Sequence, residues 1–212
     1  ASSSMSGLCQ RGRGRERGIR PGPEAVERER EKPMRAVLLL IAMLGLAACS
    51  GRPSLDDPAL SERELNLEEF FAGKSVAHGQ FQDRFGTVRR RFVVEIEGRW
   101  DGEVLTLVED FVYEDGAEER RVWRLRKTGP ETWEGRAEGV QGVAAGEERG
   151  DTFNWRYTID LPIPAADGSA RTLRATFDDW MWLLSEDRLL NRAYMSRFGV
   201  EIGEVILVFE KR

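Results

Sequence analysis

The sequence predicts an all-β fold, an antiparallel up-and-down meander of about eight to ten strands closed into a β-barrel, with a short helix before the first strand. Three observations lead to this prediction. Apolar and polar residues alternate along most segments after residue 75, turn pairs such as Asp-Gly separate these segments, and none of them has a helical period. Because consecutive long hairpins leave an unpaired strand at each edge, closure into a barrel is expected.

The alternation is clearest in the segment 151–161. Phe153, Trp155, Tyr157 and Ile159 alternate there with polar residues, so their shared face is expected to lie inside the barrel. Turn signals divide the chain into nine expected strands, at 75–83, 87–100, 103–114, 118–128, 131–140, 151–161, 170–184, 188–198 and 204–211.

A short helix is expected at 66–73, just before the first strand. Asn66 is placed to cap its N-terminus, Glu69 follows three residues later as in a capping box, and Gly73 can end it. Phe70 and Phe71 on this helix are expected to cover one end of the core.

The N-terminal quarter of the chain has a different composition. Residues 1–48 carry nine Lys or Arg against five Glu, whereas all six Trp, ten Phe and three Tyr follow residue 48. We expect 1–33 to be a disordered leader that is not part of the native protein, with Met34 as the true start. An arginine-rich arm for nucleic acid is the alternative. The remaining chain has a net charge of −9, which disfavours nucleic-acid binding.

Residues 34–48 are typical of a lipoprotein signal peptide. One positive charge precedes an apolar run that is too short to cross a bilayer, for which about 20 residues are needed; a buried helix is the alternative. The sequence LAAC, ending at Cys49, resembles the bacterial lipobox. This resemblance implies that Cys49 is lipidated, that 49–64 form a tether, and that the protein is an outer-membrane lipoprotein facing the periplasm.

The domain at 65–212 resembles a known family. The sequences NLEEFFAG, RWDGEVLTLVEDFVYEDG, FDDWMW and LLNRAYMSRFGVEIGEV are similar to those of small proteobacterial envelope lipoproteins that are catalogued only as a domain of unknown function. The similarity covers about 65–211 and implies a lipocalin-like (calycin-type) barrel without an established activity. The Gly-x-Trp of true lipocalins is absent, because Gly73-Lys74-Ser75 stands at that place.

Inward aromatic residues are the candidate ligand-binding residues. Phe92, Trp123, Trp155 and Tyr157 could line a cavity for a small apolar or amphipathic molecule. The alternative is a structural or interaction protein whose barrel is filled by its own side chains. In a packed core Trp155→Ala would cost ~3–5 kcal/mol, and in a cavity wall we expect a smaller cost.

No catalytic constellation is apparent, so we expect a protein that is not an enzyme and has neither cofactor nor metal. His78 is the one histidine and has no partner residues for a metal site, and we expect it near the barrel mouth. Asp178 and Asp179 must point to opposite faces of a strand. We expect one of them outside and the other paired with an arginine such as Arg192 or Arg197.

Overall fold

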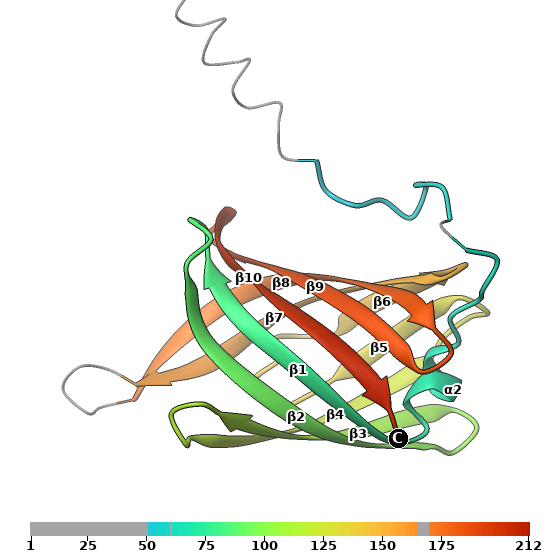
Figure 1. Cartoon of the computed structure of the whole chain (residues 1–212), viewed down its shortest axis with the longest axis horizontal. Coiled ribbons are helices and arrows are strands. Elements are labelled where there is room, and N and C mark those ends of the chain that lie inside the picture. The colour runs from blue at the N-terminus through green and yellow to red at the C-terminus, as the bar shows by residue number, and fades with distance from the viewer. Residues whose placement is uncertain (1–50, 60, 165–169) are drawn as a thin grey trace, which may run out of the picture. The chain divides into compact units, whose positions relative to one another are not determined.

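The computed structural model describes residues 51–59, 61–164 and 170–212, and residues 53–212 form one compact unit. The fold is a closed barrel of ten antiparallel strands, each paired with its neighbours in sequence, and β1 pairs with β10 (Figure 1). The predicted barrel and the short helix before it are therefore confirmed. The elements are α2 (Leu67–Phe71), β1 (Gly73–Asp83), β2 (Val88–Trp100), β3 (Val104–Tyr113), β4 (Glu118–Lys127), β5 (Thr132–Arg136), β6 (Ala144–Arg149), β7 (Thr152–Pro164), β8 (Ala170–Ser185), β9 (Arg188–Arg197) and β10 (Val200–Lys211).

The sequence-based division into nine strands missed β6. Its sequence, AAGEER, has no β-branched or aromatic residue, so it lacks the usual features of a strand. The small residues are needed for packing, because a Cβ on Gly146 would lie 2.6 Å from Cζ of Phe153. A strand of poor propensity thus forms where large rings of the neighbouring strand β7 need space.

The helix α2 closes one end of the barrel, and its N-terminus is satisfied differently from the prediction. Asn66 makes no capping hydrogen bond with its side chain. Instead, the backbone N–H of Leu67 donates to Oε1 of Glu148 on β6, at 2.7 Å. Phe70 and Phe71 are buried as expected. The helix is held so closely that a Cβ at Gly98 would overlap the Phe71 carbonyl oxygen.

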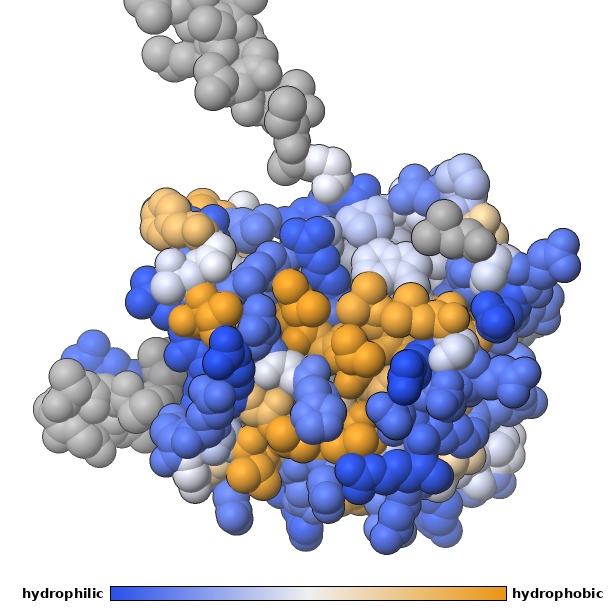
Figure 2. Space-filling model, in the orientation of Figure 1, coloured by the Kyte–Doolittle hydropathy of each residue, from blue (hydrophilic) through white to orange (hydrophobic). Residues whose placement is uncertain are grey.

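The outside of the barrel carries an apolar row. Cross-strand pairing places Val93, His78, Val208, Leu190 and Trp182 next to one another across β2, β1, β10, β9 and β8. Figure 2 shows apolar side chains gathered on this face. The expected position of His78 near the barrel mouth was wrong: His78 is exposed in the middle of β1, because the alternate residues of that strand face the core.

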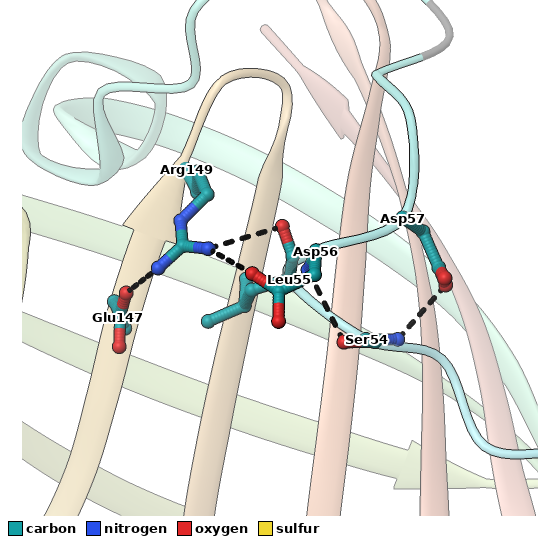
Figure 3. A network of polar contacts seen from close by, with 6 residues as sticks. All are labelled: Ser54, Leu55, Asp56, Asp57, Glu147 and Arg149. Atoms are coloured by element: carbon teal, nitrogen blue, oxygen red, sulfur yellow. Dashed lines mark hydrogen bonds and ion pairs between the residues drawn. The ribbon is translucent and has the colours of Figure 1, made fainter.

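The segment 53–59 lies against the outside of the barrel near β6. Arg149 donates to Oδ1 of Asp56 at 2.7 Å and to the Leu55 carbonyl at 3.4 Å, and it also pairs with Glu147 at 2.6 Å (Figure 3). Ser54 and Asp57 close a local turn, in which the Ser54 N–H donates to Oδ2 of Asp57 at 2.9 Å. Part of the predicted tether is therefore in contact with the domain. No helix among the described residues is long and apolar enough to cross a membrane.

Candidate functional site

The barrel encloses a cavity of about 370 Å³. At one end, which we call the plugged end, α2 contributes Leu67 and Phe71 to the lining. Towards the other end the lining reaches Arg90 and the exposed Pro162. The lining is mostly apolar, and its aromatic members are Phe71, Phe81, Phe92, Phe111, Tyr113, Trp123, Phe153, Trp155, Tyr157, Phe177 and Phe209.

All four residues predicted to line a cavity do so, namely Phe92, Trp123, Trp155 and Tyr157. Trp123 meets Trp155 and Tyr157 edge to face, with ring centroids 5.7 and 5.1 Å apart. Phe92 lies on another part of the wall, 5.9 Å from Phe111. Binding of a ligand by these side chains stays a prediction.

Trp155 is packed more tightly than a freely accessible cavity wall requires. It is 4% exposed, stacks on Phe153 at a centroid distance of 5.7 Å, and lies against two glycines. A Cβ at Gly135 would lie 2.7 Å from Cζ2 of the Trp155 ring. Trp155 thus belongs both to the cavity lining and to the packed core beside it.

Polar groups that the sequence analysis did not assign to the cavity lie among these aromatics. We call Glu109, Glu119, Arg121 and Asp179 the acidic cluster. Arg121 pairs with Glu119 at 2.5 Å, and Glu109 lies directly opposite Arg121 in the pairing of β3 with β4. The Tyr113 hydroxyl donates to Glu119 at 2.9 Å, which with burial and the negative charge of Glu119 raises the pKa of Tyr113 to about 12.

Two carboxyls of the cluster have strongly raised pKa values. Burial raises the pKa of Asp179 to about 8, against a hydrogen bond from Tyr157, whose Oη lies 3.4 Å from Oδ2. Burial likewise raises the pKa of Glu109 to about 7, although the positive charge of Arg121 opposes this shift. Both groups therefore bind protons near neutral pH, which an ordinary surface carboxyl does not do.

The prediction for the Asp178–Asp179 pair was right about the faces and wrong about the partners. Asp178 points outward and accepts hydrogen bonds from Arg156 and Asn154, each at 2.9 Å. Asp179 points into the cavity and forms no ion pair with an arginine of the described residues. Neither Arg192 nor Arg197 pairs with them, because Arg192 on the outer surface pairs with Glu204.

One signal in the sequence could have revealed the cluster. Glu109 lies two and four residues from Leu107 and Leu105 on β3, so the three side chains point to the same face of the strand. Arg121 likewise shares a face with Trp123 on β4. Charged residues in the inward register of an otherwise apolar face are costly, so they indicate a site. Among the described residues, no group of three or more His, Cys, Asp or Glu side chains is arranged to hold a metal ion.

Fold and site together define a closed antiparallel β-barrel of ten strands with an aromatic-lined cavity. The chain belongs to the family described as protein of unknown function (DUF3833), whose model matches residues 43–211. A search of curated protein sequences found no match.

Two solved structures resemble this chain. The S-type phycobiliprotein lyase of Guillardia theta is similar with a TM-score of 0.50 and 11% identity, over 70% of this chain and 93% of that one. At this identity the likeness to the lyase concerns the fold alone. A redesigned β-barrel, mFAP1, bound to DFHBI, is similar with a TM-score of 0.35 and 8% identity, over 68% of this chain and 97% of that one.

Proposed function

We propose that the protein is a lipid-anchored lipoprotein of the bacterial outer membrane, facing the periplasm, whose barrel holds a small apolar or amphipathic molecule. The observation that carries the binding function is the cavity of about 370 Å³ with its aromatic wall. Ligand sites typically start at roughly 300 Å³ and combine apolar walls with a few polar groups. A barrel filled by its own side chains would leave no such volume.

The proposed anchor rests on the sequence. Cys49 lies outside the described residues, so its support is the LAAC motif behind an apolar run. Attached acyl chains would hold the barrel at a membrane surface, and two or more chains give stable anchoring. A barrel held at that surface would be close to a pool of apolar molecules.

Native mass spectrometry of protein purified from its own envelope, followed by lipid extraction, tests the binding function. We expect a small apolar or amphipathic molecule to be released on unfolding. Ala193→Trp would fill the cavity from its wall and should lose this molecule, whereas Ser196→Trp, facing outward on the same strand, should retain it. Wild-type protein without a bound molecule that also takes up no lipid probe would contradict the proposal.

The anchor is tested separately by labelling with radioactive palmitate. Wild-type protein should incorporate the label and begin at Cys49, whereas Cys49→Ala should remain an unlabelled precursor. Replacing Ser50 by Ala leaves the thiol in place and serves as the control. Normal maturation of the Cys49→Ala protein would contradict lipid anchoring without affecting the binding function.

A further inference from the structure

The cavity lining contains more acidic than basic side chains. Its acidic cluster has three carboxyls, from Glu109, Glu119 and Asp179, and one guanidinium, from Arg121. Arg121 is already paired with Glu119. The other guanidinium of the lining, on Arg90, is bound by Asp115 outside the cavity at 2.8 Å and lies over the Tyr113 ring at 3.5 Å. Asp179 is thus left without an ion-pair partner among the described residues, and Glu109 shares the charge of Arg121 with Glu119.

Asp179 is the clearest of these groups. Its residue is 7% exposed and lines the cavity, and its Oδ1 is buried without a hydrogen-bond partner among the described residues. A buried carboxyl oxygen that lacks a partner is costly and uncommon in folded proteins. Glu109, half-buried on the same cavity, feels the charge of Arg121 but accepts no hydrogen bond within the described chain. The second oxygen of Asp179 and the carboxyl of Glu109 therefore have room for a hydrogen-bond donor from a bound molecule.

We propose that the cavity selects amphipathic amines: an apolar body packs against the aromatic wall, and its ammonium group binds between Asp179 and Glu109. This inference rests on the proposed binding function. An ammonium donates up to three hydrogen bonds and neutralises charge, which suits these two carboxyls. A fatty acid is disfavoured beside Asp179, because its carboxylate would lie next to two further acids and the guanidinium of Arg121 is held by Glu119. A carboxylate would have to use Nε of Arg90, towards the other end of the cavity, which is buried without a partner among the described residues.

The same arrangement couples binding to protons. In the free protein the raised pKa values keep much of Asp179 and Glu109 protonated at neutral pH. An ammonium favours the ionised carboxylates, so binding releases protons and strengthens as the pH rises. The charged and titratable groups around Asp179 are Tyr157 on the paired strand β7 and Asp178, its neighbour on β8. The other such groups in the cavity lining are Glu119 and Arg121 on β4, Glu109 and Tyr113 on β3, and Arg90 on β2.

The test compares three probes that differ only in their head group: decylamine, decanol and decanoic acid. Binding is followed by the fluorescence of the cavity tryptophans, Trp123 and Trp155, and by calorimetry. We expect decylamine to bind wild-type protein at least tenfold more tightly than the other two. Asp179→Asn and Glu109→Gln should each weaken decylamine at least tenfold and leave decanol within twofold.

A matched control lies one residue away. Asp178→Asn removes a carboxyl on the outer face of the same strand, whose charge acts on Asp179 only from the opposite face, and should change none of the three affinities by more than about threefold. If the cavity variants fail to fold, the wild-type protein alone still tests the inference. Calorimetry in buffers of different ionisation enthalpy should detect the release of roughly one proton per decylamine bound at about pH 6. Binding of decanol should release none.

Several outcomes would overturn the inference. If decanol or decanoic acid bound as tightly as decylamine, the preference for amines would be wrong. The same holds if Asp179→Asn and Glu109→Gln left the affinity for decylamine unchanged. Either result would leave the proposed binding function intact. Decylamine binding to wild-type protein without proton release at about pH 6 would likewise contradict the inference. If none of the three probes bound, both the inference and the proposed function would fail.

Discussion

Glu148, at the plugged end of the barrel, and Asp179, in the cavity wall, are both buried carboxyls, 5% and 7% exposed. Glu148 accepts the Leu67 N–H at 2.7 Å, and Oε2 lies 3.6 Å from Nζ of Lys127, which also binds Glu68. Asp179 has one long hydrogen bond from Tyr157, and its second oxygen has no partner in the described part of the chain. At the plugged end, Lys127 lies between two acids, Glu68 and Glu148, although Oε2 of Glu68 is also buried without a partner among the described residues.

This difference separates a structural carboxyl from a candidate binding carboxyl. A protein retains a buried acid without partners only if the rest of the fold can bear its cost, and such acids are concentrated at functional sites. Glu148 caps the N-terminus of α2 and joins the helix to the barrel, so its removal should affect stability. Asp179 accepts only one long hydrogen bond, from Tyr157, among the described residues, so its removal should affect binding more than stability.

The largest effect on the free energy of unfolding is expected at Trp155, in the tightly packed part of the cavity wall. Trp155→Ala should reduce the free energy of unfolding by ~3–5 kcal/mol, because the ring leaves a cavity beside Phe153 and the two glycines. The sequence analysis gave a smaller cost for a residue in a loosely packed cavity wall, but the tight packing of Trp155 favours the larger value. Urea denaturation checks it, with the outward Trp182→Ala as the comparison. Equal losses in the two variants would show that Trp155 has no special packing role.

The second prediction tests the plugged end. Glu148→Ala leaves the Leu67 N–H without an acceptor and Lys127 with one partner fewer, and should cost about 2–3 kcal/mol in urea denaturation. Glu147→Ala, which affects the exterior pair with Arg149, should cost much less. A loss in Glu148→Ala no greater than that in Glu147→Ala would mean that the helix is held by apolar packing alone.

The sequence predicts more of this fold than of its site. Alternation and Asp-Gly turns are local signals, and they place the inward aromatics Phe92, Trp123, Trp155 and Tyr157 correctly. Strand β6 escapes because its small residues serve the rings of β7, a requirement that comes from across the sheet. The sequence shows that Glu109 shares the inward face of Leu105 and Leu107, but not that Asp179 lines the same cavity, because this follows only when closure of the barrel places β3 opposite β8.

The third prediction concerns the pH dependence of stability. Asp179 rises from its ordinary 3.8 to about 8 and Glu109 from 4.5 to about 7, so the folded state binds more protons than the unfolded state. Their contribution to stability is complete below the unfolded pKa values and is lost as the pH rises through the folded ones. The unfolding free energy should therefore fall steadily as the pH rises from about 4 to about 8.

The double variant Glu109→Gln/Asp179→Asn should flatten most of this slope. A residual decrease is expected from Glu148, whose pKa is raised by burial as well. Urea titrations at several pH values measure the effect, and Asp178→Asn again provides the control. A slope that is unchanged in the double variant would remove the acidic cluster from the explanation.

The smallest effect is expected on the outer surface, where ion pairs lie in water. Arg120 and Asp110 form a two-pronged pair at 2.6 and 2.8 Å, as close as the pairs inside the barrel. Their side chains are 68% and 45% exposed, so solvent screens the attraction and the separated groups are well hydrated. Arg120→Ala should thus leave the urea midpoint and probe binding unchanged, whereas Arg121→Ala, one residue away but facing the cavity, should alter both. A shift in Arg120→Ala as large as that in Arg121→Ala would mean that burial does not distinguish these two arginines, and the contrast between the inner and outer faces would fail.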